Sequence, residues 1–303
     1  MVGNQSPSRR PPADLIHAYD AAADGWDAGP GPMYAPLART LVAAAPVPLT
    51  GRVVLDLGAG TGVAGRAALA AGAHRVVGAD LSEAMLHRHA LKDRAFEDRA
   101  AGCPVAADAV ALPFRDGCFD LALAAFCLNH LIRLADGLAE LRRVAGAIAA
   151  STFAAGWTHP AKEAVDEAAR SFGYHPPSWY TALAPGERAA DPELLASCAA
   201  AAGFTRVQTR TMAVPTPVAT PAALAAWRLG MAHYAPFLQT LDASARIAVR
   251  RAAEQAVAAS GAAGPLTVEM TVLTARRPAH HDESPLPEPP APEIGIVRQF
   301  WLP

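Results

Sequence analysis

The stretch VVLDLGAGTG at residues 53–62 restricts the folds open to this chain more than any other segment. Its first half is short, apolar and β-branched at the start, which is typical of a strand buried in a parallel sheet. Its second half is a glycine-rich turn that leads directly into a helix expected at residues 63–71. Glycines allow a close approach of the backbone to a ligand, and the first N–H groups of a helix bind anions. The segment therefore predicts a strand–turn–helix unit that holds a dinucleotide or a nucleoside, or that makes a tight turn without a ligand.

The rest of the chain continues this alternation of strands and helices. Helical segments separate the early strands, which is the pattern of βαβ units. The predicted fold class is α/β, with a doubly wound, mostly parallel seven-stranded sheet and a helical cap inserted after the fifth strand. Besides the strand at the start of the glycine-rich stretch, strands are expected at residues 74–79, 105–107, 120–126, 147–153, 204–213 and 266–275.

The predicted elements divide the structured part of the chain into a ligand-binding body and two helical inserts. The body comprises residues 13–155 and 191–277, and the inserts are residues 156–190 and 214–262. An insert between late strands is expected to lie over the carboxyl edge of the sheet, where open α/β sheets bind ligands.

The two terminal segments have a different composition. Residues 1–12 lack hydrophobic periodicity, so we expect a disordered N-terminus, and residues 278–303 form a proline-rich tail with an apolar end. Because Ile, Val, Phe, Trp and Leu stand close together in residues 294–302, we expect this end to dock on the body of the chain or on a neighbouring subunit.

The composition argues against several classes of protein. Lys and Arg number 26 against 28 Asp and Glu, and the net charge of −2 gives no support for a nucleic-acid partner. No apolar run approaches the roughly 18 residues of a membrane helix, and the N-terminal segment lacks the apolar core of a secretory signal. The 4 cysteines have no CxxC spacing, which is unlike a zinc cluster or a disulfide framework. We therefore expect a cytoplasmic monomer or homodimer without a metal, a nucleic acid or a membrane as partner.

Three carboxylates at the ends of predicted strands narrow the choice of ligand. Asp56 stands inside the glycine-rich segment, where a carboxylate is unfavourable beside a pyrophosphate but well placed for an ammonium group. Asp80 ends the second strand, where an acidic side chain accepts hydrogen bonds from ribose hydroxyls. Asp108 ends the third strand and can accept a hydrogen bond from an adenine amino group. The dinucleotide fingerprint needs a glycine where this chain has Val63, so the pattern favours a cationic nucleoside.

Together these motifs resemble the class I S-adenosylmethionine-dependent methyltransferases, specifically the small-molecule group called type 11. The resemblance rests on VLDLGAGTG, GAD at residues 78–80, AADAVALPF around Asp108, and FDLALAAFCLNHL, and it covers roughly residues 19–153. It implies a Rossmann-like methyltransferase fold, with S-adenosylmethionine as cofactor and S-adenosylhomocysteine as product. The cofactor-binding residues that it implies are Tyr19, Asp56, Gly58, Ala59, Gly60, Gly62, Asp80, Leu81, Met85, Asp108, Ala109 and Phe126.

The implied reaction is methylation of a small-molecule acceptor, for which we expect a secondary metabolite methylated on oxygen, nitrogen or carbon. His130 follows the fourth strand, where it is a candidate general base, because histidine titrates near neutral pH. His233 and Tyr234 are candidate acceptor contacts, which would make the two inserts an acceptor-side cap.

Alternative functions stay open at this point. A protein of the same fold can bind the cofactor without methyl transfer, or can catalyse a ring closure or rearrangement. An NAD-dependent oxidoreductase is a further alternative, but Val63 and the absence of a Tyr-x-x-x-Lys pair disfavour it.

Overall fold

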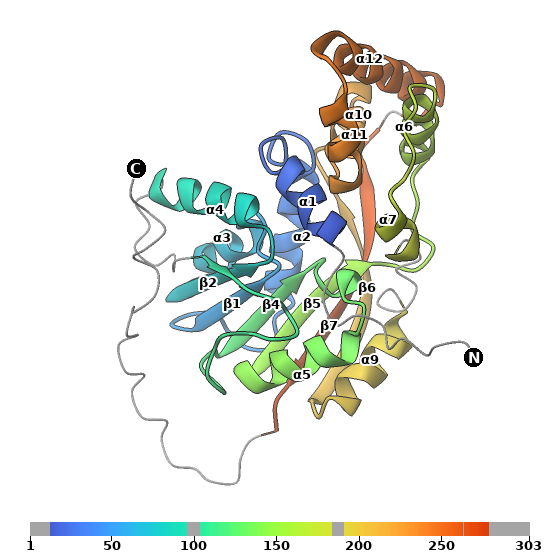
Figure 1. Cartoon of the computed structure of the whole chain (residues 1–303). Coiled ribbons are helices and arrows are strands. Elements are labelled where there is room, and N and C mark those ends of the chain that lie inside the picture. The colour runs from blue at the N-terminus through green and yellow to red at the C-terminus, as the bar shows by residue number, and fades with distance from the viewer. Residues whose placement is uncertain (1–12, 96–103, 184–190, 263, 279–303) are drawn as a thin grey trace, which may run out of the picture.

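The structure, a computed structural model, describes residues 13–95, 104–183, 191–262 and 264–278. A seven-stranded sheet in the order β3-β2-β1-β4-β5-β7-β6 forms its centre (Figure 1). All neighbouring strands pair in parallel except β7, which is antiparallel to β5 and β6. The predicted doubly wound, mostly parallel sheet is therefore confirmed. The strands are β1 (Val53–Leu57), β2 (Arg75–Asp80), β3 (Val105–Ala106), β4 (Leu121–Ala125), β5 (Ala147–Phe153), β6 (Thr205–Pro215) and β7 (Thr267–Arg276).

The central strands are mostly apolar because both faces of the sheet are buried. Val54 and Leu121 belong to one hydrophobic cluster, and Leu55 and Ala122, the next residue in each strand, belong to another. Residues of α2 and α3 complete the first cluster, and residues of α5 and α9 complete the second. The helices of the body are α1 (Ala13–Ala22), α2 (Gly31–Ala43), α3 (Val63–Ala70), α4 (Glu83–Ala95), α5 (Leu134–Val144) and α9 (Pro192–Ala201), with a 3₁₀ turn η1 (Leu128–His130).

Capping residues fix where several helices begin. The Asp191 carboxylate accepts a hydrogen bond from the N–H of Glu193 at 2.8 Å, and α9 then starts at a proline. The Ser82 hydroxyl accepts a hydrogen bond from the N–H of Met85 at 3.2 Å at the start of α4. Local side-chain chemistry therefore determines these boundaries.

Helix α2 begins earlier than the composition of residues 25–36 suggests, because this segment is rich in Gly and Pro, which are typical of irregular chain. In the structure the helix begins at Gly31 and includes both Pro32 and Pro36. Pro32 stands in the first turn and loses no hydrogen bond, because the N–H groups there have no partner within the helix, whereas Pro36 stands inside the helix. The consequence for the site is that Tyr34 stands on a helix and not on a loop.

The two inserts come together at one end of the sheet (Figure 1). Buried residues of α6, α10 and α12 share a hydrophobic cluster, including Val165, Leu224 and Val249. Residues of α7, η2 and α11 contact α1 instead. We call these helices the cap: α6 (Pro160–Arg170), α7 (Ser178–Leu183), α10 (Pro221–Leu229), η2 (Ala232–Tyr234), α11 (Ala235–Thr240) and α12 (Ala243–Ala259).

Some predictions concern residues outside the described ranges. These are the disordered segment 1–12 and the docking of residues 294–302 in the tail. Among the helices that the structure describes, none has the length and apolar character needed to cross a membrane.

Candidate functional site

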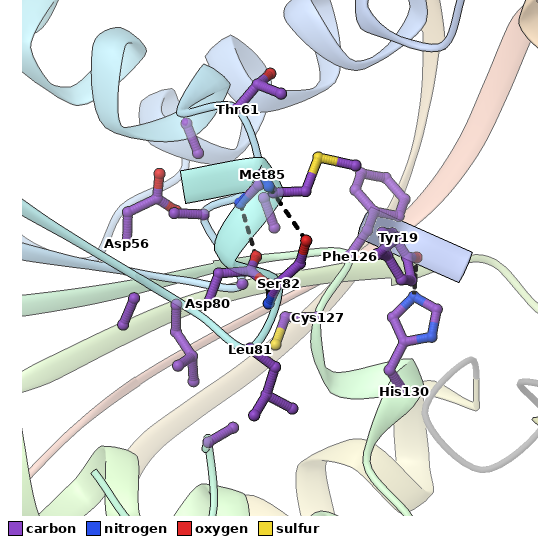
Figure 2. A pocket seen from close by; sticks show the side chains of 18 of the residues that line it. Tyr19, Asp56, Thr61, Asp80, Leu81, Ser82, Met85, Phe126, Cys127 and His130 are labelled. Atoms are coloured by element: carbon purple, nitrogen blue, oxygen red, sulfur yellow. Dashed lines mark hydrogen bonds between the residues drawn. The ribbon is translucent and has the colours of Figure 1, made fainter. Parts of the chain in front are cut away.

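A cavity lies at the carboxyl ends of β1, β2 and β4, the edge of the sheet at which the sequence predicts a ligand (Figure 2). One side consists of the glycine-rich turn after β1 and the loops after β2 and β4. The opposite side comes from α1, α2 and their connection. Within the described ranges every lining residue belongs to residues 15–131, so the cap does not contribute to the walls.

The glycine-rich turn requires glycine at specific positions. Gly58, Gly60 and Gly62 have φ angles of 67°, 53° and 84°, a region that L-residues with side chains rarely adopt. A Cβ atom on Gly58 would also stand 2.7 Å from the Cβ of Cys127. Gly58, Ala59 and Gly60 line the cavity. Gly62 immediately precedes α3 and packs against the ring of His89 instead. The turn therefore presents bare backbone to the cavity at its first two glycines.

Asp56 is buried at the end of β1, beside the first turn of α3. Its Oδ2 accepts a hydrogen bond from the N–H of Gly65 at 2.7 Å. Its Oδ1 is also buried, and the described part of the chain gives that atom no hydrogen-bond partner. Because burial disfavours the charged form, the pKa of Asp56 is raised to about 7. A cationic group in the cavity would satisfy the free oxygen and stabilise the carboxylate.

Asp80 ties the end of β2 to the glycine-rich turn. Its Oδ2 accepts a hydrogen bond from the N–H of Gly60 at 2.8 Å, and its Oδ1 accepts one from the N–H of Ser82 at 2.9 Å. Burial raises the pKa of this carboxyl, although the two N–H donors act against the rise. Each oxygen retains a second lone pair, so Asp80 can also accept hydrogen bonds from a ligand. Leu81 and Met85, which follow it, line the cavity as well.

Asp108 occupies a different position from the other two carboxylates. Ala107 and Ala109 on either side of it line the main cavity, whereas Asp108 borders a smaller neighbouring cavity together with Arg133. Its Oδ1 accepts a hydrogen bond from the N–H of Val110 at 3.1 Å, which forms a tight turn. The structure thus brings Asp56 and Asp80 to the main cavity and leaves Asp108 beside it.

Tyr19 and His130 meet at the opposite end of the cavity from Asp56 (Figure 2). The Tyr19 hydroxyl lies 2.9 Å from Nε2 of His130, and Nδ2 of Asn129 lies 3.3 Å from the same nitrogen. Burial lowers the pKa of His130 to about 4 and raises that of Tyr19 well above its usual value. The imidazole is therefore neutral at physiological pH, and its Nδ1 is buried with no hydrogen-bond partner in the described part of the chain.

Four aromatic side chains that contact one another line the cavity, and we call them the aromatic wall: Tyr19, Trp26, Tyr34 and Phe126. Trp26 stacks on Tyr34 with ring centroids 5.7 Å apart and an interplanar angle of 16°. The ring centroids of Tyr19 and Trp26 are 5.7 Å apart, and those of Tyr34 and Phe126 are 5.3 Å apart. Phe126 has a φ of 54°, which makes it one of two non-glycine residues with positive φ in the described ranges. Sequence reasoning found Tyr19 and Phe126 and missed the other two, which lie in the segment taken for an irregular crossing.

Two carboxylates hold the N-terminal segment over the glycine-rich turn, and sequence reasoning missed both. The Ser82 hydroxyl donates a hydrogen bond to Oδ1 of Asp20 at 2.6 Å. The Thr61 hydroxyl donates one to Oδ1 of Asp27 at 2.9 Å. A pattern of acidic residues in AYDAAADGWD was the available signal. These bonds close the cavity on the side of α1.

The structure does not bring His233 and Tyr234 to the cavity. Both are buried in the cap, where the Tyr234 hydroxyl donates to Asp166 and the His233 ring stacks on Tyr180 at 3.9 Å. Arg228 binds Asp166 with two hydrogen bonds of 2.7 and 2.8 Å. These side chains are engaged in the packing of the cap because a buried guanidinium needs a paired carboxylate.

The strand order and the glycine-rich turn followed by Asp80 define the fold of class I methyltransferases. Residues 55–147 match the family model of a methyltransferase domain. Residues 55–147 are thus similar to a methyltransferase domain, and the chain has the Rossmann-like fold of the S-adenosylmethionine-dependent class I methyltransferases.

Relatives with assigned names match parts of the chain. A demethylmenaquinone methyltransferase of Clavibacter sepedonicus is 44% identical over 108 residues, which are 35% of this chain and 42% of that protein. A malonyl-[acyl-carrier protein] O-methyltransferase of Halorhodospira halophila is 38% identical over 143 residues, which are 45% of this chain and 46% of that protein. The chain spans less than half the length of these relatives.

Among solved structures, the [4+2]-cyclase SpnF aligns with a TM-score of 0.55 and 17% identity, covering 90% of this chain and 98% of that chain. Such a likeness shows the fold alone, because the same fold hosts different reactions.

Proposed function

We propose that this protein transfers a methyl group from S-adenosylmethionine to a small-molecule acceptor. The observation that carries the proposal is the convergence of Asp80, Asp56 and the bare backbone of the glycine-rich turn in one cavity. The two named relatives are methyltransferases whose names give different acceptors. Each matches less than half of this chain, so the acceptor has to be inferred from this chain's own residues. A secondary metabolite, methylated on oxygen, nitrogen or carbon, remains our prediction.

The residues of the cavity fit S-adenosylmethionine. The unpartnered Oδ1 of Asp56 suits the ammonium group of the methionine part, and Asp80 suits the ribose hydroxyls. Leu81, Met85 and Ala109 provide an apolar surface for the adenine, and Phe126 borders the region of the sulfonium. When bound, the cofactor supplies a methyl group on a positively charged sulfur, which is already a strong electrophile.

The remaining cofactor contacts follow from the turn and from α1. Gly58, Ala59 and Gly60 leave room for the methionine part because no side chain larger than a methyl group stands there. Tyr19 approaches from the opposite side. Gly62 is proposed to shape the turn, and Asp108 is proposed to contact the adenine, which a bound structure tests.

The chain's part in the reaction is to exclude water, align the acceptor and take up a proton where the acceptor carries one. His130 is the proposed base, because its neutral imidazole can accept a proton at Nε2. The Tyr19 hydroxyl lies 2.9 Å from that nitrogen, and both residues line the cavity. Burial makes this histidine a weak base, which suits an acceptor with an acidic O–H group.

The cap is proposed to act on the acceptor side without lining the cavity. It packs against α1, which carries Tyr19, and against the connection between α1 and α2. His233 and Tyr234 support this arrangement through their contacts within the cap.

The proposal is tested by incubating the full chain with S-adenosylmethionine and candidate acceptors, and by measuring S-adenosylhomocysteine and methylated product by mass spectrometry. His130→Ala should lower turnover about 100-fold or more while leaving the Kd for S-adenosylhomocysteine unchanged. His87→Ala on the outer part of α4, away from the cavity lining, is the matched control and should keep full activity.

Different outcomes separate the alternatives. Binding of the cofactor without release of S-adenosylhomocysteine, together with cyclised product of unchanged mass, would replace methyl transfer by ring closure. Tight binding of NAD in place of S-adenosylmethionine would overturn the proposal altogether.

A further inference from the structure

On the side formed by α1, α2 and their connection, no described lining residue carries a charged side chain. The charged side chains that line the cavity, Asp56 and Asp80, stand at the ends of β1 and β2. Both already accept hydrogen bonds from backbone N–H groups of the turn and α3. The walls contributed by α1 and α2 are apolar or aromatic, including Leu15, Ile16 and Ala38.

This distribution of charge disfavours an anionic acceptor. No lysine or arginine stands among the described lining residues, so the chain itself offers no counter-ion to a carboxylate, phosphate or sulfonate. It would also approach two carboxylates in the same cavity. The nearest buried cation on the cap side, Arg228, is neutralised by the two hydrogen bonds that it makes to Asp166.

The aromatic wall provides an apolar surface instead. Trp26 and Tyr34 stack with nearly parallel planes, and Phe126 meets Tyr34 edge-on. Small residues such as Ala38 and Ala64 line the cavity beside them. A planar ring fits such a surface, because aromatic rings favour stacked and edge-to-face contacts with one another.

The Tyr34 hydroxyl belongs to this wall and makes no hydrogen bond within the described ranges. The residue lines the cavity and is half-buried. Burial raises the pKa of Tyr34, so the hydroxyl keeps its proton and can donate. A hydroxyl that lines a cavity and has no protein partner is available to a ligand.

We propose that the acceptor is an uncharged aromatic compound with a hydroxyl group, and that Tyr34 donates a hydrogen bond to the oxygen of that group. The ring lies against the aromatic wall, and Tyr34 is a binding residue that determines which acceptors are used. This inference rests on the proposed function, because a compound bound to the aromatic wall is an acceptor only if the protein transfers methyl groups.

Calorimetric titration of the full chain loaded with S-adenosylhomocysteine tests the inference with a matched set of probes. The probes are 6-hydroxynaphthalene-2-sulfonamide, which is neutral, its sulfonate, which is anionic, and unsubstituted naphthalene and 2-naphthol. The sulfonamide should bind at least about 10-fold more tightly than the sulfonate, since the two differ mainly in charge. Tyr34→Phe should weaken 2-naphthol about 3- to 10-fold and leave naphthalene unchanged, because naphthalene has no oxygen for the bond.

Tyr174→Phe is the matched control, since Tyr174 is a buried residue of the cap region that does not line the cavity. This variant should change the affinity neither for 2-naphthol nor for naphthalene. If Tyr34→Phe does not fold, naphthalene binding is lost too, and the comparison of 2-naphthol with naphthalene in the parent chain then tests the hydrogen bond. Equal affinities for sulfonamide and sulfonate, or a Tyr34→Phe variant that weakens S-adenosylhomocysteine and not 2-naphthol, would overturn the inference. Ring binding without methyl transfer to any hydroxylated ring would instead count against the proposed function.

Discussion

Replacing Asp80 by alanine should weaken the binding of S-adenosylmethionine more than any other single change at the strand ends. The carboxylate accepts hydrogen bonds from Gly60 at 2.8 Å and from Ser82 at 2.9 Å, so it holds two cofactor-binding segments together. It also offers the acceptor oxygens for the ribose. The substitution removes the ligand contact and loosens the backbone around it.

The magnitude follows from these contacts. Leaving the ribose hydroxyls without their charged acceptor should cost roughly 1–3 kcal/mol of binding, or about 5- to 150-fold in Kd. The loss of two charge-assisted hydrogen bonds should lower the free energy of unfolding, but the net fall should be smaller than the sum of the two bonds. Burial raises the pKa of Asp80, and removing the carboxyl also removes the cost of burying its charge.

Isothermal titration with S-adenosylhomocysteine measures the effect, and Asp120→Ala provides a control of the same chemical type. Asp120 accepts a hydrogen bond from the N–H of Val53 at 2.8 Å and one from Arg52 at 2.9 Å, at the amino end of β1 and away from the cavity. Asp120→Ala should lower the melting temperature without changing Kd. An Asp80→Ala variant that binds the ligand as tightly as the parent chain would refute the assignment of the ribose site.

Three further predictions concern the turn, the buried carboxyl and the cap. The pKa of Asp56 is about 7 in the folded chain against 3.8 ordinarily, so the free energy of unfolding should fall as the pH rises from about 4 to about 7 and this carboxyl ionises. Over the same pH range a cationic ligand should bind more tightly as the pH rises, and its binding should release a proton. Titration calorimetry in two buffers of different ionisation enthalpy measures that proton, and Asp56→Asn should abolish the effect. Gly58→Ala should reduce cofactor binding severely because its Cβ would stand 2.7 Å from a cysteine side chain, whereas Gly51→Ala, with a similar φ of 75° and free space around it, should affect only stability; equal effects on binding would contradict this reasoning. Arg228→Ala should lower the free energy of unfolding by roughly 3–5 kcal/mol in urea titrations, since it strands the carboxylate of Asp166, and a smaller loss is expected when both are replaced by apolar residues.

The sequence was sufficient to predict the parts of the site that are encoded within a few residues. Asp56 and Asp80 each end a buried strand, and strands of a parallel sheet bring their carboxyl ends to one edge. The glycine-rich turn is readable because its backbone angles demand glycine. The seven-stranded sheet follows from the same local patterns of apolar runs and helix caps.

The remaining features depend on contacts between distant segments. Tyr34 joins the cavity because α2 begins earlier than the glycines and prolines suggested, and because its ring stacks on Trp26. Tyr234 turns away from the cavity toward Asp166, a residue 68 positions distant in sequence. Hydrophobic periodicity indicates that such residues are buried, but it does not say which neighbour they meet.

The most direct test of the central claim is a crystal structure of the full chain with S-adenosylhomocysteine. The account predicts that the ligand occupies the cavity at the carboxyl ends of β1, β2 and β4, with its ribose hydroxyls bound to Asp80 and its amino-acid part over Gly58 and Gly60. A ligand bound elsewhere on the chain, or in this cavity without a contact to Asp80, would contradict it.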